Sequence, residues 1–138
     1  MSVLSFYVPG PPRGKQRPRH GKGHTYTPAA TVAAEKEIAW EARRAMKGLK
    51  LFDGPLSVDI TALYALPASW SKKKLKEVFA SGEWKTSKSD LDNIVKLLAD
   101  ALNGVVWQDD AQVVKLSCVK KYTSVADSEG LYVLVAAL

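Results

Sequence analysis

The most regular stretch of this 138-residue sequence is LDNIVKLLADALNG, residues 91–104. Its apolar side chains recur at the three- and four-residue spacing of an amphipathic helix. These side chains are Leu91, Ile94, Val95, Leu98, Ala101 and Leu102. The pair Asn103-Gly104 is typical of a helix end. The stretch therefore predicts a helix from about Leu91 to Asn103, with one face buried against a core.

Strand patterns lie on both sides of this helix. Apolar and polar residues alternate most clearly after Gly54-Pro55, where every second side chain from Leu56 to Tyr64 is apolar or aromatic. The last strand is apolar on both faces, as a central strand would be. The expected strands span residues 3–8, 56–64, 112–122 and 131–138.

Two further helices are expected before the central one. The first begins with Thr27 as N-cap and Pro28 in the first helical position, and it ends near Lys47. The second is a short, lysine-rich helix that ends near Ala80. Residues 1–138 thus predict a single α+β domain, with a small mixed β-sheet of about four strands covered by helices.

Positive charge is concentrated near the N-terminus. The chain has 20 Lys and Arg against 14 Asp and Glu, a net charge of +6, and no acidic residue precedes Glu35. Beyond residue 34, the remaining 15 bases and 14 acids nearly cancel. This asymmetry favours a polyanionic partner such as nucleic acid. The basic residues of the Gly- and Pro-rich segment up to His24, expected to be an exposed loop, are Arg13, Lys15, Arg17, Arg19 and Lys22.

Several classes of protein are excluded by composition. A single cysteine, Cys118, excludes an internal disulfide and a zinc site built from several cysteines. No apolar run approaches the roughly 20 residues of a membrane span. The first residues lack the charged-then-apolar order of a secretory signal. We therefore expect a cytoplasmic protein that does not insert into a membrane.

Acidic residues gather around the central helix. Asp90 and Asp92 lie at its start, and Asp109-Asp110 follow its end. One carboxylate at a helix start is explained by capping or by the helix dipole, but two pairs exceed what a cap requires. Like charges repel each other unless a cation lies between them. Carboxylate oxygens without neighbouring Cys or His ligands suit a hard cation, Mg²⁺ or Mn²⁺.

Spacing alone leaves two points open. The helix is about 20 Å long, so Asp110 must return alongside it to meet Asp92, and a solvated turn is an equally good interpretation. Lys96 follows Asp92 by four residues and lies on the same helix face. It could stabilise charge on a phosphate, or form only an ion pair worth about 0.3–0.5 kcal/mol.

The acidic segments together resemble a known family. DLDNIVK (90–96), DALNG (100–104) and DDAQV (109–113) are similar to the signature of RusA Holliday-junction resolvases, many of them prophage-borne. The resemblance extends to PGPP (9–12) with its basic loop, YTP (26–28) and residues 67–71, and so covers most of the chain. Ser89 departs from the pattern, because many relatives carry Pro before the first aspartate.

The resemblance implies a homodimeric, Mg²⁺-dependent endonuclease, with Mn²⁺ as a possible substitute. Such an enzyme cuts four-way DNA junctions with paired symmetric nicks in recombination and repair. By position, Asp90, Asp92 and Asp110 match the catalytic, metal-binding aspartates, and Lys96 matches the catalytic lysine. The role of Asp109 stays open.

DNA contacts are expected from the basic loop and from the segment before Asp90. The predicted DNA-binding residues are Arg13, Lys15, Arg17, Arg19, Lys22, Lys85 and Lys88. Contacts of this kind go mainly to phosphates and are sensitive to salt. Lys72, Lys73 and Lys74 are interpreted as a solvated helix face. The alternative functions are a metal-dependent nuclease for other branched DNA and a DNA-binding protein without catalysis.

Overall fold

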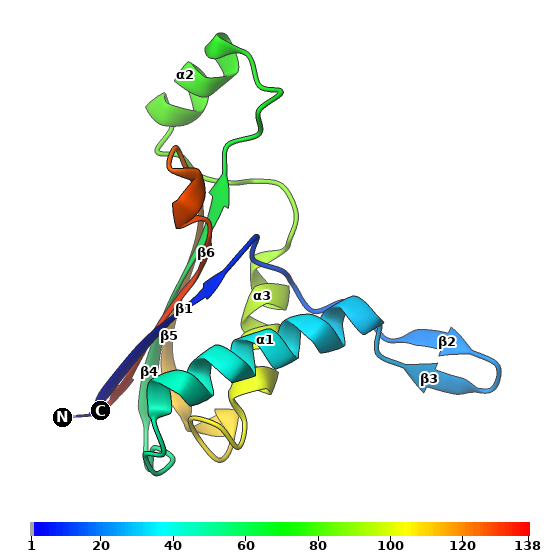
Figure 1. Cartoon of the computed structure of the whole chain (residues 1–138), viewed down its shortest axis with the longest axis vertical. Helices are drawn as coiled ribbons and strands as arrows, with labels where there is room; N and C mark the ends of the chain where they lie inside the picture. Colours follow the sequence, from blue (N-terminus) through cyan, green and yellow to red (C-terminus); the bar gives the residue numbers. More distant parts are fainter. Residues whose placement is uncertain (1) are drawn as a thin grey trace.

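The fold is built on one mixed sheet, which the computed structural model of residues 2–138 shows with helices packed on one face (Figure 1). In spatial order its four strands are β1 (Val3–Pro9), β6 (Gly130–Ala137), β4 (Leu56–Ala65) and β5 (Val113–Thr123). β1 and β6 are antiparallel, as are β6 and β4, whereas β4 and β5 are parallel. This confirms the predicted α+β class and the mixed sheet.

Two helices cover the sheet and close the core. α1 (Ala29–Met46) contacts both β1 and α3 (Leu91–Leu102). The alternating residues of β4 put Leu56, Val58 and Ile60 beneath these helices, each at most 1% exposed. Burial of apolar surface at about 25 cal/mol per Å² is the main force that holds the two layers together. The position of α3 therefore follows from its apolar face.

A separate hairpin replaces part of the expected exposed loop. β2 (Arg19–Gly21) and β3 (His24–Tyr26) pair antiparallel and project away from the sheet (Figure 1). The start of α1 also differs from the prediction, because Pro28 is the N-cap and no side chain caps this end. With only three residues in each strand, the hairpin is too short to show an alternation pattern in the sequence.

The remaining elements connect the sheet and the helices. α2 (Lys72–Ala80) projects beyond the end of the sheet, where β4 leads into it (Figure 1). Two short 3-10 turns, η1 (Asp110–Gln112) and η2 (Ala126–Ser128), precede β5 and β6. Within residues 2–138, no helix combines the length and the apolar character needed to cross a bilayer.

Leu91 is a correction to the predicted core face of α3. Its side chain is 41% exposed, whereas Ile94 and Leu98 are each 1% exposed. Leu91 is the first residue of the helix. The first turn of α3 therefore extends beyond the packed core. Asp90 and Asp92, at the start of this helix, are exposed as well.

Candidate functional site

The outer face of α3 carries a row of charged side chains. Asp92, Lys96 and Asp100 follow at intervals of four residues, away from the buried apolar face. Lys96 Nζ lies 3.7 Å from Asp92 Oδ2, and the two side chains are 63% and 70% exposed. An ion pair this exposed contributes between zero and about 1 kcal/mol to stability. Both groups are therefore free to exchange this contact for a ligand.

Asp90 occupies the N-cap of α3 without capping it through its side chain. Its backbone is extended, and its carbonyl oxygen accepts the first helical hydrogen bonds, from Asn93 N (3.1 Å) and Ile94 N (3.2 Å). The carboxylate makes no capping hydrogen bond. Side-chain capping therefore does not explain an acid in this position, although the dipole of α3 favours negative charge there.

A basic hollow of about 500 Å³ lies beside Asp90. Its wall includes five of the seven predicted DNA-binding residues, together with Asp90 and Asn93. The electrostatic field in the hollow favours an anion next to the Asp90 carboxylate. The five basic residues are Arg13, Lys15, Arg17, Arg19 and Lys88.

The basic loop is fixed to the helices at its N-terminal part. Lys15 N donates to Asn93 O (2.9 Å), and Gln16 N donates to the buried hydroxyl of Thr31 (3.2 Å). A side chain at Gly14 would bring a Cβ within 3.1 Å of Ser89 and Asn93, so the loop approaches α3 closely there. These contacts hold Arg13 and Arg17 near the start of α3.

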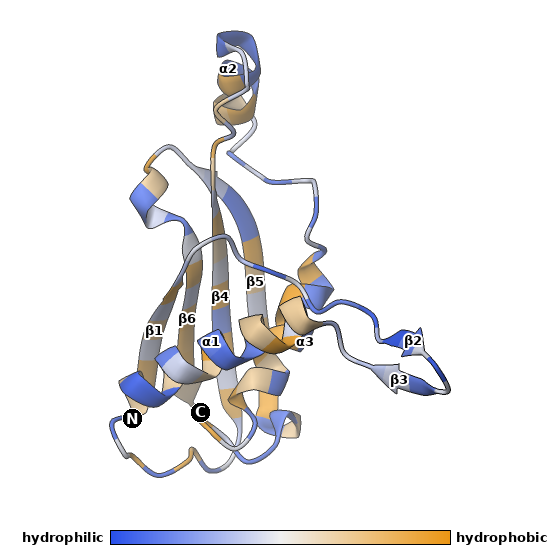
Figure 2. Cartoon of the chain, turned by 45° about the vertical axis from the view of Figure 1, so that its right-hand side comes forward, coloured by the Kyte–Doolittle hydropathy of each residue, from blue (hydrophilic) through white to orange (hydrophobic). Residues whose placement is uncertain are grey.

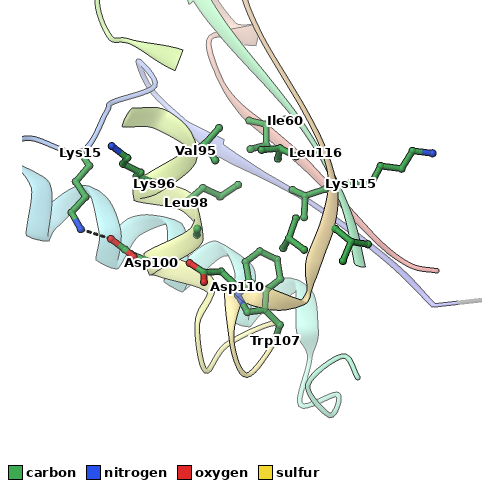
Figure 3. A pocket seen from close by; sticks show the side chains of 14 residues that line it. Lys15, Ile60, Val95, Lys96, Leu98, Asp100, Trp107, Asp110, Lys115 and Leu116 are labelled. Carbon is green, nitrogen blue, oxygen red and sulfur yellow. Dashed lines mark hydrogen bonds and ion pairs between the residues drawn. The ribbon is translucent and has the colours of Figure 1, made fainter. Parts of the chain in front are cut away.

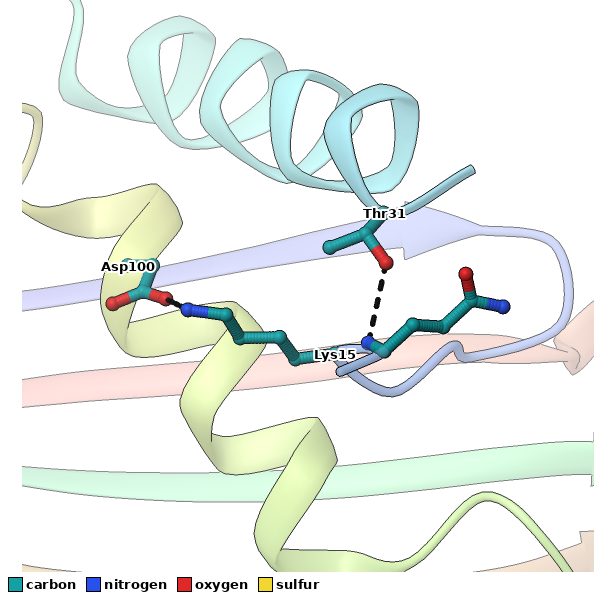
Figure 4. Close-up of polar contacts among 4 residues, drawn as sticks. Lys15, Thr31 and Asp100 are labelled. Atoms are coloured by element: carbon teal, nitrogen blue, oxygen red, sulfur yellow. Dashed lines mark hydrogen bonds and ion pairs between the residues drawn. The ribbon is translucent and has the colours of Figure 1, made fainter. Parts of the chain in front are cut away.

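Lys15 links this loop to the far part of α3. Its Nζ lies 2.5 Å from Asp100 Oδ2 (Figure 4). The hydrogen bond to Asp100 raises the pKa of Lys15, although partial burial opposes the effect. In this structure the ammonium group is therefore engaged with a carboxylate, and its predicted contact with DNA phosphate stays a prediction.

Asp110 faces a second pocket, of about 460 Å³, between α3 and β5 (Figure 3). Lys96 and Asp100 line the same pocket above an apolar floor that includes Leu98 and Trp107. Burial raises the pKa of Asp110 most. The hydrogen bond with Asp109 and the negative charges of Asp109 and Asp100 raise it further. A cation in this position would relieve the repulsion among these acids.

Asp109, whose role the sequence left open, stabilises the turn. Its side chain accepts a hydrogen bond from Ala111 N (3.0 Å), and the Gln112 side chain accepts from Asp109 N (3.2 Å). This reciprocal pattern is a capping box at the start of η1. The cap orients Asp110, so Asp109 acts on the site through its neighbour.

The three predicted metal ligands do not form one cluster in the described chain. Among residues 2–138, no three His, Cys, Asp or Glu side chains are close enough to hold an ion between them. Asp110 lies near Asp100 (Figure 3), which is about 12 Å along the helix axis from Asp92. The donors suit Mg²⁺ chemically, but their placement here does not fit a single three-carboxylate site.

The segment that leads into Asp90 is held by two lysines. Lys120 Nζ donates to the carbonyl oxygens of Ser87 and Ser89, at 2.7 Å each. Lys85 packs on the Tyr64 ring at 4.5 Å and donates to Lys88 O. Burial, and then the charge of Lys120, lower the pKa of Lys85. Lys85 and the more distant Lys22 lie outside the basic hollow, so their DNA contacts also stay predictions.

Three residues that shape the site were not among the predicted site residues. Asp100 begins the DALNG segment of the resemblance and continues the four-residue spacing of Asp92 and Lys96, so its place in the site could have been predicted. Thr31 and Lys120 carry no such signal, since each acts on a segment distant in the sequence.

The comparison with protein families shows which family this chain belongs to. Residues 9–133 match the family model described as Endodeoxyribonuclease RusA. The chain belongs to the RusA endodeoxyribonuclease family. This confirms the resemblance found in the sequence, and it makes DNA the substrate class of the family. Metal dependence is typical of such nucleases, and the acidic residues beside the basic hollow suit phosphodiester chemistry.

A curated relative matches a similar share of the chain. The uncharacterized protein YqaN of Bacillus subtilis (strain 168) is 36% identical over 129 residues. The aligned region covers 89% of this chain and 90% of the relative. The sequence similarity therefore covers most of both proteins.

Proposed function

We propose that this RusA-family protein is a Mg²⁺-dependent endonuclease that resolves four-way DNA junctions by paired symmetric nicks. The observation that supports it most strongly is the basic hollow, in which Asp90 lies among Arg13, Arg17 and other basic residues. A DNA phosphate attracted by these side chains would lie next to a carboxylate that has no capping role.

Lys96 is proposed to act on the reacting phosphate. Its ammonium group is exposed and bound only weakly to Asp92, at 3.7 Å. A fixed positive charge at the position where negative charge develops lowers the barrier to hydrolysis. Lys96 would therefore turn from Asp92 towards the phosphate when DNA binds.

Asp90, Asp92 and Asp110 are the proposed ligands for Mg²⁺, with Mn²⁺ as a substitute. A divalent cation supplies charge that polarises a phosphate and lowers the pKa of a bound water. Because no three acidic side chains of the described chain are close enough to hold one ion, no fixed position is assigned to it. Asp109 serves the turn and is not proposed as a ligand.

A homodimer is proposed because a four-way junction is two-fold symmetric. One copy of the chain carries one set of candidate catalytic residues, and paired nicks require two sets. Light scattering of the purified protein should give twice the 15.1 kDa mass of the chain. A mass of one chain at micromolar concentration, with or without a junction, would contradict the dimer.

A cleavage assay on three substrates tests the function. A synthetic mobile four-way junction, a flap and a linear duplex are incubated with Mg²⁺ or with EDTA. We expect symmetric nicks in the junction only, and none with EDTA. Cleavage of the flap at an equal rate would indicate a nuclease for branched DNA in general. Tight binding without cleavage in Mg²⁺ and Mn²⁺ would indicate a DNA-binding protein that lacks catalysis.

A further inference from the structure

The helix α2 forms a second basic projection, separate from the basic hollow. Its nine residues include Lys72, Lys73, Lys74 and Lys76 against one acid, Glu77. Figures 1 and 2 show α2 beyond the end of the sheet, while the hairpin of β2 and β3 projects in another direction. The hydrophilic colours of Figure 2 mark both the tip of α2 and the hairpin.

The lysines of α2 are not neutralised by the protein. All four are exposed. In the described chain, the ion pairs are Lys15–Asp100, Arg44–Glu41 and Lys96–Asp92, and none of them involves α2. Lysines without an ion-pair partner produce a positive electrostatic potential around α2. Ion pairs with acidic side chains would have reduced this potential.

The projection is anchored at both of its ends. Before α2, Trp70 packs edge-on against Tyr122 of β5, with ring centroids 4.9 Å apart. After α2, Tyr122 N donates to Glu83 O (2.8 Å) and Lys85 N donates to Lys120 O (3.2 Å). These contacts hold α2 in a defined position, so its charges are pre-organised for a ligand.

Two exposed aromatic side chains lie in α2 and in the segment that follows it. Trp84 is 52% exposed and Phe79 is 45% exposed, although both are large apolar residues. Lys121 Nζ lies 5.0 Å from the Trp84 ring. Lysines with neighbouring exposed aromatics can bind phosphates and also stack on sugars or bases.

We propose that α2 and Trp84 bind a second arm of branched DNA, while the basic hollow holds the arm that is cut. Residues 81–90 connect α2 to the start of α3, where the basic hollow includes Asp90. A linear duplex at the basic hollow would leave α2 unused, whereas a branched substrate would engage both surfaces. This inference rests on the proposed function and adds a source of preference for branched DNA.

The test removes charge from α2 while keeping side-chain length. The variant Lys72→Gln/Lys73→Gln/Lys76→Gln is compared with Lys36→Gln/Lys47→Gln/Lys50→Gln, which removes the same charge from exposed residues in and after α1. Lys74 is kept because it packs over Trp70, at 5.1 Å. Binding to a four-way junction and to a short duplex is measured across a series of salt concentrations.

For the α2 variant, we expect the slope of log affinity against log salt to flatten on the junction, by about one for each phosphate that α2 no longer neutralises. The slope on the short duplex should equal that of the wild type. The α1 control should leave both slopes unchanged. An unchanged junction slope, or equal flattening on duplex and junction, would overturn the inference. Equal flattening by the control would overturn it as well.

Trp84→Ala tests the aromatic part of the surface. We expect lower affinity for the junction with an unaltered salt slope, because an uncharged contact is removed. An unaltered affinity in a variant that melts like the wild type would overturn the role of Trp84. A wild-type protein that neither binds nor cleaves DNA would refute the proposed function itself. Normal wild-type activity with insensitive α2 variants would refute only this inference.

Discussion

Asp92 and Lys96, which have proposed catalytic roles, also form an ordinary ion pair with each other. The 3.7 Å ion pair between them is exposed and weak, so it does not account for the presence of both residues. Asp90 likewise stands in a capping position without capping. In each case the side chain is available for a ligand.

Replacing Asp92 with Asn should separate cleavage from binding. Asp92→Asn removes one negative charge and one strong oxygen ligand, so we expect junction cleavage to be abolished while junction binding persists. Gel shift and cleavage assays on the same junction measure the two properties. Asp53→Asn, at an exposed acid of the loop before β4, is the control and should keep both. Full cleavage by Asp92→Asn would refute the assignment.

Asp110 should make stability depend on pH. Its pKa is raised above its ordinary 3.8 by burial, and then by Asp109 and Asp100. The folded chain thus binds this proton more tightly than the unfolded chain, so the ionised group destabilises the fold at neutral pH. The destabilisation decreases as the pH falls below the raised pKa of Asp110 in the folded chain. It is lost below 3.8, the ordinary pKa that applies to the unfolded chain.

We therefore expect Asp110→Asn to melt at a higher temperature than the wild type at pH 7. The difference should shrink towards pH 3, where both side chains are neutral. Scanning calorimetry across this range measures it, and Asp53→Asn should show no comparable trend. A difference that grows on acidification would contradict the raised pKa.

Among the elements, the basic loop and α3 form one unit with the start of α1. Gln16 N donates to Thr31, and Lys15 N donates to Asn93 O. The loop is therefore held in place at its base, while the hairpin beyond it projects from the body (Figure 1). This arrangement presents Arg17 and Arg19 next to the start of α3.

Thr31→Val should loosen this unit, because it removes the acceptor of the Gln16 N–H while preserving side-chain shape. We expect a loss of about 0.5–1.5 kcal/mol in the free energy of unfolding, measured in urea. Trypsin should also cut faster after Arg19, whereas Pro18 blocks cleavage after Arg17. Thr27→Val is the matched control. Thr27 is exposed and does not cap α1, so its change should stay within about 0.5 kcal/mol.

Arg17→Gln/Arg19→Gln should weaken DNA binding, because fewer phosphates are neutralised. We expect the slope of log affinity against log salt to flatten by about one for each such phosphate, on duplex and junction alike. Fluorescence anisotropy at several salt concentrations measures this slope. The Lys36→Gln/Lys50→Gln variant removes equal charge elsewhere and should keep the wild-type slope. An unchanged slope in the arginine variant would exclude the loop from DNA binding.

Across the molecule as a whole, one apolar layer between the sheet and the helices carries the stability. Leu98 lies within this layer at 1% exposure, while Leu91 of the same helix is 41% exposed. Two leucines of the same helix thus lie in different environments, one in the core and one partly in solvent. The first turn of α3, which carries candidate catalytic residues, lies outside the core that supports it.

Alanine substitutions should reveal this division. Leu98→Ala should lower the free energy of unfolding by about 2–5 kcal/mol, because it leaves a cavity in the core. Leu91→Ala should cost less than about 1 kcal/mol, since its side chain is already partly in water. Urea unfolding of both variants measures the difference. Equal losses would mean that the first turn of α3 belongs to the core.

Elements with a local pattern could be predicted from the order of residues alone. The apolar spacing of residues 91–104 predicted α3, and the alternation at 56–64 predicted β4, because side-chain periodicity follows directly from backbone geometry. The RusA signature is likewise a pattern along the chain. The candidate catalytic residues Asp90, Asp92, Lys96 and Asp110 were therefore predicted from the sequence, and their roles stay predictions.

Which of these residues meet depends instead on tertiary packing. The fold places Lys15 on Asp100, Asp110 beside Asp100, and Lys120 on the segment before Asp90. These contacts join segments far apart in the chain, and the packing of α3 on the sheet sets their distances. A repeating pattern predicts which face of a helix or strand is buried. It does not predict the position of one element relative to its neighbour along their length, and that position determines which side chains meet.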